Sequence, residues 1–388
     1  MKKLWQIISY ILVAALAAAA ALFFANGAPQ QVFGVKQSKL DQLADLIEER
    51  FIGESDRKAY EDAAAAAMVD ALGDEWSYYI PADQMQTHME SMNNSYVGVG
   101  ITITVHEDGT GFLVTKVNEG GPAHQAGMEA GDVIVGIEGE PASGMTAEEA
   151  KDLVRGAVNT QVMLTVRRGE EEFDLSVVRM EVLTPVAEGQ MLRDNIGLIT
   201  IANFDARCFG ETKAAIESLV DQGATGLVFD VRNNPGGYKH ELVNILDYLL
   251  PAGPLFRSEF YTGQTEVDSS DASCLKIPMA VLVNDNSYSA AEFFAAALSE
   301  YDAATVVGQQ TYGKGYFQTT ITLNDGSAVG LSVGRYTTPN GASLAGVGIT
   351  PDIPVEVDEE TYFKIYAGIL EPEEDPQIQA AVDALKQS

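Results

Sequence analysis

Alternation between strand-like and helix-like segments in the second half of the chain limits its fold more than any other feature. The strand-like segments are residues 197–201, 226–231, 280–283 and 305–307, and the helix-like segments between them are residues 212–221, 241–250 and 290–300. This order predicts an α/β domain. Ligands of such domains gather at the carboxyl ends of the strands, where residues 233–237 and 287–289 both fall.

The rest of the chain has a different local pattern in each part. Apolar residues at helical spacing predict helices at 40–51 and 60–72, with a loop to residue 79. From Tyr96 the apolar residues alternate, which predicts a small β-rich domain. A polar stretch at 257–274 is interpreted as a surface insertion, and an acidic linker precedes a last helix ending at 385.

We therefore predict a mixed α/β (α+β), multidomain chain. Its parts are a membrane or signal segment (1–27), a helical segment packed on the core (36–92), a β-rich domain (93–182), an α/β core (183–357) and an acidic linker with a C-terminal helix (358–388).

The N-terminus carries a targeting signal. Lys2 and Lys3 precede an apolar run from 4 to 24. A secretory signal core has about 7–15 apolar residues and a membrane span needs about 20, so the run favours an uncleaved single-pass anchor. The lysines stay inside, which places the rest of the chain outside the cytoplasm. Small residues at 25–28 leave a cleaved, secreted form open.

Charge and cysteine content exclude several functions. The formal net charge of −32 disfavours nucleic-acid binding. Cys208 and Cys274 fit no metal-binding spacing, and the sequence leaves open whether they form a disulfide. No metal or organic cofactor is indicated.

Ser289 is the predicted nucleophile. It follows a buried strand and a short turn and precedes a helix, where backbone N–H groups can stabilise an oxyanion. No histidine follows Ser289, so Lys314 is the predicted base. Glycines and aromatic residues surround Lys314 with no adjacent acid, and burial without a counter-charge lowers a lysine pKa. Gln318 can hold the amine by a hydrogen bond.

The glycine pair Gly236 and Gly237 follows another strand and is a candidate oxyanion hole. Adjacent glycines expose backbone N–H groups with little steric hindrance, and the N–H of Ala290 is the natural second donor. A turn that needs positive φ explains the same glycines equally well.

Two alternative serine sites remain open. Residues 330–334 match the G-x-S-x-G nucleophile motif, but no histidine follows Ser332 and its segment alternates as a strand, so we interpret Ser332 as structural. His240 precedes Ser289, which keeps a Ser289/His240 pair as an alternative.

The β-rich domain offers a peptide-binding site. Its glycine-rich entry can surround a C-terminal carboxylate with N–H groups beside an apolar pocket. The candidate residues are Tyr96, Gly98, Val99, Gly100, Ile101 and Leu153.

Together these motifs resemble the C-terminal processing peptidases, or tail-specific proteases, over nearly the whole chain after residue 27. The resemblance rests on the loop before Tyr79, the PDZ-like stretch from Tyr96 with 121–123 and 130–132, residues 232–237, 289–292, 313–318, 335–336 and 348–352. It implies a serine endopeptidase with a Ser289/Lys314 dyad assisted by Gln318, and a PDZ domain that binds substrate tails and gates the site. Ala291 departs from the family pattern, which has serine there.

The sequence thus predicts a protease that cuts proteins near apolar C-terminal tails through an acyl-enzyme. A non-catalytic PDZ adaptor and, less favoured, a serine esterase are the alternatives. Substrate identity, a homo-oligomer or regulatory partner, and the resting contact between Ser289 and Lys314 are left undetermined.

Overall fold

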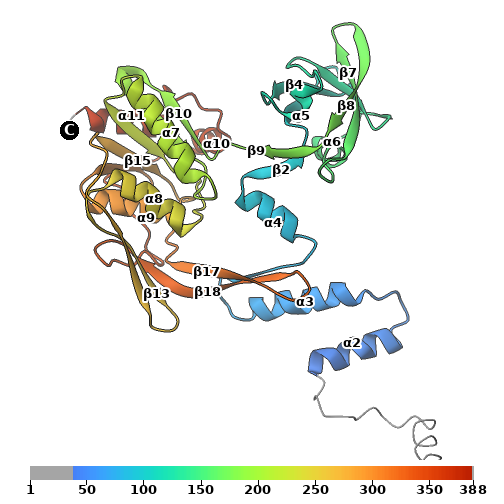
Figure 1. Cartoon of the computed structure of the whole chain (residues 1–388), viewed down its shortest axis with the longest axis horizontal. Coiled ribbons are helices and arrows are strands. Elements are labelled where there is room, and N and C mark those ends of the chain that lie inside the picture. The colour runs from blue at the N-terminus through green and yellow to red at the C-terminus, as the bar shows by residue number, and fades with distance from the viewer. Residues whose placement is uncertain (1–37, 387–388) are drawn as a thin grey trace, which may run out of the picture. The chain divides into compact units, whose positions relative to one another are not determined.

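A computed structural model of the chain describes residues 38–386 (Figure 1). The chain divides into two compact units, Met1–Met68 and Val69–Ser388, which are described separately. In the first, helices α2 (Lys39–Arg50) and α3 (Arg57–Asp70) confirm the predicted helices to within a few residues. Ser38 caps α2 through a reciprocal pair of hydrogen bonds with Asp41, a common helix-start motif.

No helix within residues 38–386 is both long and apolar enough to cross a membrane. The predicted anchor at residues 4–24 lies outside the described residues.

The β-rich domain of the second unit contains an antiparallel sheet whose strands differ in length. Its strand order is β3-β4-β5-β7-β8, with β6 paired to β5, and helix α6 packs beside it. The bounds are β3 (Ile101–Val105), β4 (Phe112–Val117), α5 (Pro122–Gln125), β5 (Val133–Ile137), β6 (Glu140–Pro141), α6 (Ala147–Val154), β7 (Gln161–Arg168) and β8 (Glu171–Val178). The sheet confirms the predicted small β-rich domain.

A two-stranded ribbon precedes and follows this domain. Strand β2 (Ser95–Gly98), which comes after helix α4 (Met85–Met92), pairs with β9 (Met180–Leu183) in antiparallel register. Both ends of the domain therefore leave through one narrow connection.

The α/β domain contains a six-stranded sheet in the order β10-β11-β12-β15-β16-β19. All neighbouring strands are parallel except the β10–β11 pair. The bounds are β10 (Ala187–Met191), η1 (Arg193–Asn195), β11 (Ile196–Ile201), β12 (Gly226–Asp230), β15 (Met279–Val283), β16 (Ala304–Gly308) and β19 (Ile353–Pro354). The predicted strand–helix alternation is confirmed.

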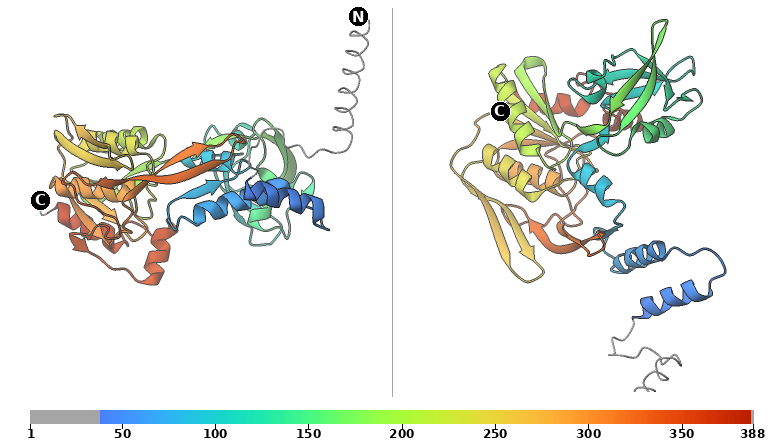
Figure 2. Two further views of the ribbon diagram at one scale, coloured as in Figure 1. Left: turned by 90° about the horizontal axis from the view of Figure 1, so that it is seen from below. Right: turned by 45° about the vertical axis from the view of Figure 1, so that its right-hand side comes forward.

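Helices cover both faces of this sheet (Figure 2). Helices α7 (Cys208–Asp221), α8 (Lys239–Leu249) and α9 (Ala290–Glu300) pack on one face, and α11 (Pro376–Leu385) packs on the other. Successive residues of each strand point to opposite faces, so the two buried sides read as a continuous apolar run in the sequence. Helix α10 (Glu359–Tyr366) precedes α11.

A second sheet corrects the predicted surface insertion at 257–274. That stretch forms β13 (Gly253–Phe260) and β14 (Thr265–Ser270), which join β1 (Tyr78–Ile80), β17 (Tyr316–Thr322) and β18 (Ala328–Thr337). The insertion prediction was wrong because the hairpin buries only a few residues, such as Phe256 and Ser258, and leaves the rest polar. Alternation is therefore weak in the sequence.

A buried ion cluster joins the end of β12 to the start of α11. The Arg232 guanidinium pairs with Asp230 at 2.6 Å and with Asp375 at 2.7 Å, and it donates to Gln377 at 2.9 Å. The side chain of Arg232 is only 5% exposed. Fully paired in this way, a buried arginine fixes the chain on one side of the glycine-rich loop.

Candidate active site

Three loops meet at the carboxyl ends of neighbouring parallel strands, where α/β folds place their sites. They follow β12, β15 and β16. The buried Ser287 hydroxyl donates to Val231 O at 2.7 Å, and the Asn284 side chain accepts from Asn233 N at 2.9 Å. Tyr312 N donates to Ser287 O at 3.2 Å. The sequence folds so that nucleophile, glycine pair and lysine lie on one connected set of turns.

Ser289 has a backbone conformation that few non-glycine residues adopt. It is the residue before α9, with φ 58° and ψ −124°. Positive φ of this kind costs about 1–3 kcal/mol and persists only where the surroundings impose it. A sharp strand-to-helix turn of this type presents a serine hydroxyl above the end of a sheet.

The glycine loop passes directly against this turn. A Cβ on Gly236 would lie 2.8 Å from Ser289 Cβ and 2.9 Å from Ala290 N. A Cβ on Gly237 would lie 2.3 Å from the carbonyl carbon of Phe204. Both positions therefore require glycine for close approach, in addition to their positive φ.

The N–H groups of the loop are not equivalent. Gly236 N donates to the Asn234 side chain at 2.8 Å, so its proton is already engaged. Within residues 38–386, the N–H groups of Gly237 and Ala290 have no acceptor. Of the two predicted glycines, Gly237 is thus the one with an available donor.

Glu292 connects the Ser289 turn to the Lys314 segment. Its carboxyl is fully buried and accepts Ser289 N at 3.0 Å and Lys314 N at 2.8 Å on one oxygen. The other oxygen accepts Thr311 Oγ1 at 2.6 Å and Gly313 N at 2.7 Å. Burial raises the pKa of Glu292 despite these hydrogen bonds.

The sequence analysis included Glu292 in the range 289–292 but predicted no role for it. A glutamate three residues after a helix-start serine is itself a capping signal, and it could have identified the residue.

Lys314 is half-buried and has no ion-pair or hydrogen-bond partner for its amine within the described part of the chain. Nζ lies over the Trp76 ring, 4.2 Å from its centroid, and 5.9 Å from the centroid of Tyr288. Burial lowers the pKa of Lys314 to about 8, although Asp74, Glu292 and Glu75 raise it. No hydrogen bond joins this amine to Ser289 Oγ in residues 38–386.

Gln318 lies on β17 and points to a different partner from the one predicted. Its Nε2 donates to Ser332 Oγ at 3.0 Å, and Ser332 N donates to Ser77 Oγ at 3.1 Å. Ser77 in turn donates to Asp74. This polar chain runs from the second sheet to the loop beside Lys314.

The alternative nucleophile sites are not assembled. Ser332 lies within strand β18, opposite Gln318, and not at a turn, as the sequence analysis predicted. The side chain of His240 is 67% exposed and stacks on Tyr238. Cys208 and Cys274 are both free, so they do not form a disulfide. Residues 38–386 contain no cluster of potential metal ligands.

Comparison with known proteins agrees with this geometry. The family model of peptidase family S41 matches residues 195–355, and that of the PDZ domain matches residues 113–168. The chain is 31% identical over 368 residues to a probable CtpA-like serine protease of Staphylococcus aureus (strain COL), with 91% of this chain and 73% of that protein covered. The chain belongs to peptidase family S41.

Two further likenesses support the assignment. The carboxy-terminal processing protease CtpA of Bacillus subtilis (strain 168) is 30% identical, with 92% of this chain and 79% of that protein covered. A putative S41 protease from Bacteroides fragilis NCTC 9343 shares the fold, with a TM-score of 0.53, 16% identity and coverage of 89% and 97% of the two chains. The S41 peptidase is thus a serine-type C-terminal processing protease with a PDZ domain.

The predicted peptide-binding residues in the PDZ domain of this S41 peptidase differ in how accessible they are. Val99 is only 2% exposed and belongs to the domain core, so it does not line an open pocket as predicted. Gly100 has φ 75°, and the N–H groups of Val99 and Gly100 have no acceptor within residues 38–386. Leu153, at 39% exposed, is available for contact.

Tyr96 and Gly98 lie on β2, and Ile101 begins β3. Arg155 sits over the Tyr96 ring at 5.3 Å. Five of the six predicted residues thus lie at the entry to the domain, two of them in the connecting ribbon, whereas Leu153 lies on α6.

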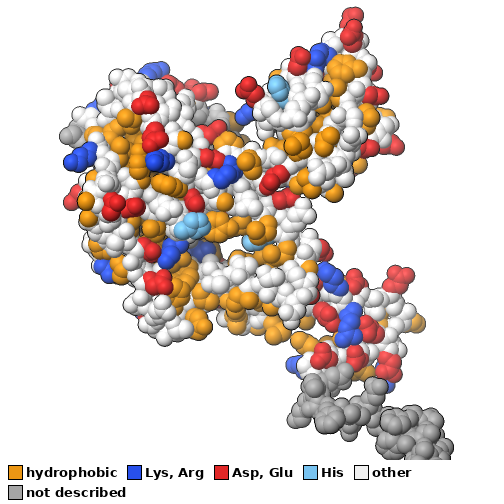
Figure 3. Space-filling view, viewed as in Figure 1, with side chains coloured by type: hydrophobic (Ala, Val, Ile, Leu, Met, Phe, Trp, Pro, Cys, Tyr) orange, Lys and Arg blue, Asp and Glu red, His pale blue; other side chains and the backbone are white. Residues whose placement is uncertain are grey.

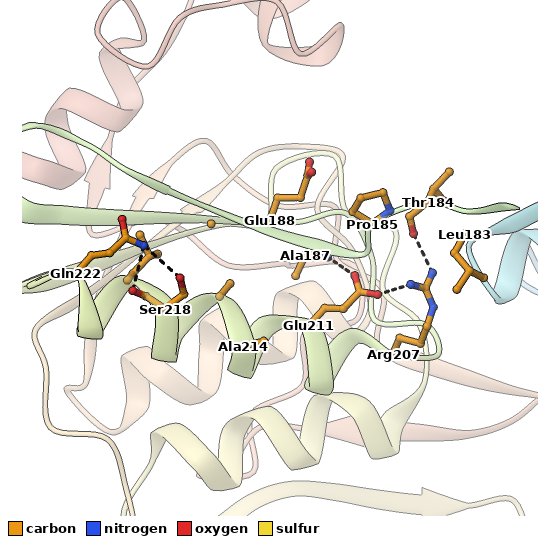
Figure 4. Close-up of a pocket in the computed structure, with 13 residues that line it drawn as sticks. Leu183, Thr184, Pro185, Ala187, Glu188, Arg207, Glu211, Ala214, Ser218 and Gln222 are labelled. Atoms are coloured by element: carbon orange, nitrogen blue, oxygen red, sulfur yellow. Dashed lines mark hydrogen bonds and ion pairs between the residues drawn. The ribbon is translucent and has the colours of Figure 1, made fainter. Parts of the chain in front are cut away.

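A separate hollow of about 470 Å³ lies between β10 and α7 in the S41 peptidase (Figure 4). Two of its three charged lining residues pair with each other: Arg207 pairs with Glu211 and donates to Thr184 O, and Glu211 also accepts Val186 N at 2.6 Å. None of the predicted catalytic residues lines it. We interpret it as a structural junction where the chain returns from β9 to the core.

Proposed function

We propose that this S41 peptidase is an endopeptidase in which Ser289 attacks the scissile carbonyl and Lys314 is the general base. The main support for this proposal is that one carboxylate oxygen of Glu292 accepts hydrogen bonds from both Ser289 N and Lys314 N. That shared contact keeps nucleophile and base on adjacent turns. The lysine also lacks a counter-ion contact within residues 38–386, which suits a base that must lose its proton.

The proposed reaction has two balanced steps. The neutral Lys314 amine takes the Ser289 hydroxyl proton as Oγ bonds to the carbonyl carbon. The resulting ammonium gives that proton to the leaving amine as the scissile C–N bond breaks, and an acyl-enzyme remains. Lys314 then takes a proton from the water that attacks the ester, and it gives this proton to Ser289 Oγ as the ester C–O bond breaks.

Gly237 N and Ala290 N are the proposed oxyanion donors, since both are unengaged beside the nucleophile turn. Removing one such donor typically costs about 10²–10³ in kcat. Gly236 contributes space for the close approach of the two loops.

Gln318 is proposed to orient the lysine during turnover. Its Nε2 is held by Ser332, whereas its Oε1 accepts no hydrogen bond within residues 38–386. That oxygen can accept an N–H from the neutral amine, which leaves the lone pair of the amine free for the serine proton.

The PDZ domain is proposed to capture the apolar C-terminal tail of a protein substrate. The unengaged N–H groups of Val99 and Gly100 suit a terminal carboxylate, and Leu153 offers apolar contact. We further propose that residues 4–24 anchor the protein in the cell membrane, with the catalytic part extracytoplasmic, and that a homo-oligomer or regulatory protein controls it.

The test uses the full chain in detergent micelles and an unfolded protein substrate with an apolar tail. A matched substrate ends in a carboxamide, which removes the terminal charge. We expect turnover of the first substrate, slower turnover of the second, and covalent fluorophosphonate labelling at Ser289.

Ser289→Ala and Lys314→Met should abolish turnover, whereas His240→Ala should not. Equal turnover by wild type and Ser289→Ala would refute the dyad. Tail binding without turnover or labelling would instead support the adaptor alternative.

A further inference from the structure

The loop of residues 73–77 is fixed to the second sheet by polar contacts rather than by burial. Ser77 donates to the Asp74 carboxylate and accepts Ser332 N at 3.1 Å. Trp76 N lies 3.4 Å from Asp74 Oδ1. The loop therefore has a defined position although its residues are only partly buried.

This loop completes an aromatic enclosure around the lysine amine. Trp76 lies 6.0 Å from Tyr288 and 5.5 Å from Tyr312, ring centroid to centroid, and the two tyrosines are 5.8 Å apart. The Lys314 amine lies over the Trp76 face at 4.2 Å. Trp76 is thus the ring of closest approach, and indole is the aromatic ring that binds cations best.

Acidic groups surround the amine, but none of those in residues 38–386 forms an ion pair with it. Asp74 and Glu75 belong to the loop, and Glu292 faces from α9. The Glu75 carboxylate accepts the Tyr312 hydroxyl, and Glu292 is engaged by four donors. Hydrogen bonds from Ser77 and Ser332 lower the pKa of Asp74 despite burial, so Asp74 is ionised at neutral pH.

We propose that the loop of residues 73–77 is a positioning element for the general base: the Trp76 ring holds the Lys314 ammonium away from Ser289 in the resting enzyme and shields it from water, while the Asp74 carboxylate favours its charged form. This inference rests on the proposed function of Lys314. Within residues 38–386, no hydrogen bond or ring contact joins Trp76 or Asp74 to Ser289, so both act through the lysine.

Burial of the amine and the charge of Asp74 act on its pKa in opposite directions. Burial is the largest influence on Lys314 and lowers its pKa to about 8, whereas Asp74 raises it. Trp76→Ala admits water and moves the pKa back toward 10.5. Asp74→Asn keeps the shape and the acceptor for Ser77 but removes the charge, and so lowers the pKa further.

A fluorescence titration tests the resting contact directly. The chain has two tryptophans, Trp5 and Trp76, so full-length protein carrying Trp5→Phe reports on Trp76 alone. We expect its emission to titrate with a midpoint near pH 8, the pKa of the neighbouring lysine. Lys314→Met should abolish this titration, and Asp74→Asn should move it to lower pH. Emission that does not titrate, or titrates equally in Lys314→Met, overturns the contact.

The pH profile of turnover tests the positioning role. Relative to wild type, the acid-limb midpoint should rise by about one pH unit in Trp76→Ala and fall by about half a unit or more in Asp74→Asn. Trp76→Phe, which keeps a ring, should restore a midpoint within about half a unit of wild type. A merely structural loop would lower the rate in both variants without moving the midpoints in opposite directions.

Failure of the inference and failure of the proposed function give different results. If Ser289→Ala or Lys314→Met retains wild-type turnover, the dyad itself is wrong. If both are inactive but the Asp74→Asn and Trp76→Ala midpoints match wild type, the dyad stands and the positioning role is refuted.

Discussion

Replacing Lys314 by methionine should stabilise the protein while it abolishes turnover. Burial lowers the pKa of Lys314 from 10.5 to about 8. Each tenfold change in proton affinity is worth about 1.36 kcal/mol, so burying the ammonium costs the folded state about 3 kcal/mol at pH 7. Methionine fills similar space without this cost. We expect Lys314→Met to raise the free energy of unfolding by about 2–3 kcal/mol at pH 7.

The pH dependence gives this prediction its sign. The folded-state pKa is depressed, so the unfolded chain binds more protons between about pH 8 and 10.5, and wild-type stability rises with pH across that window. The advantage of the variant should shrink to about 1 kcal/mol at pH 10.

Urea unfolding at pH 7 and pH 10 measures both values, in a Ser289→Ala background that prevents self-cleavage. Lys213 also lies over an aromatic ring, at 5.4 Å from Tyr248, but its side chain is 42% exposed. Lys213→Met is therefore the matched control and should change stability by no more than about 0.5 kcal/mol. A destabilised Lys314→Met, or a gain that does not depend on pH, would contradict the buried-ammonium argument.

Four further outcomes follow from the same site. Gly237→Ala should lower kcat at least tenfold in a peptide cleavage assay, because its Cβ would lie 2.3 Å from the Phe204 carbonyl carbon. Burial raises the pKa of Asp205 to about 7, so its stability penalty grows as pH rises from 4 to 7; the urea-measured gain in Asp205→Asn should grow over that range and then level off. Arg232→Met should cost about 3–5 kcal/mol in urea unfolding, since it leaves two buried aspartates unpaired. Glu292→Gln should cost about 1–3 kcal/mol in thermal or urea unfolding and reduce turnover, because its amide nitrogen cannot accept the N–H groups that the carboxylate accepts.

Much of the fold could be predicted from local sequence patterns because the core sheet is buried on both faces. Strands such as β12 and β15 are fully buried, so they are uninterrupted apolar runs between clear helices. The β13–β14 hairpin lacks this signal, since strand β14 is mostly exposed and polar. Its pairing is decided by β18, which lies far along the chain.

Candidate catalytic residues could be chosen from the sequence where a single residue type at a single turn marks the site. Ser289 and Lys314 could be chosen from a strand-to-helix turn and from the lack of later histidines. The contact of Lys314 with Trp76 could not, because the two residues come from distant segments and the loop before β1 has no periodicity. For the same reason the contact of Gln318 with Ser332 could not be predicted.

The net charge of the protein does not explain the protonation of the Lys314 amine, which depends on the groups close to it. Acidic side chains are spread over the visible surface of the molecule (Figure 3), yet the buried lysine is offset by no direct ion pair within residues 38–386. A screened surface charge contributes little to a buried amine, whereas one carboxylate at short range changes its protonation. Control of the base therefore falls to its immediate neighbours, Asp74 and Glu292.

Residues that break a local rule cluster at one edge of the sheet. Ser289 has positive φ, Lys314 is half-buried with no ion pair in residues 38–386, and Glu292 is fully buried with a raised pKa. Each would be unfavourable alone, and each is compensated by another: Glu292 fixes the turns of Ser289 and Lys314, and their N–H groups satisfy its carboxyl. Unfavourable groups that are retained together point to function rather than to folding. The lysine is thus a destabilising member whose removal should leave the scaffold intact and the chemistry absent.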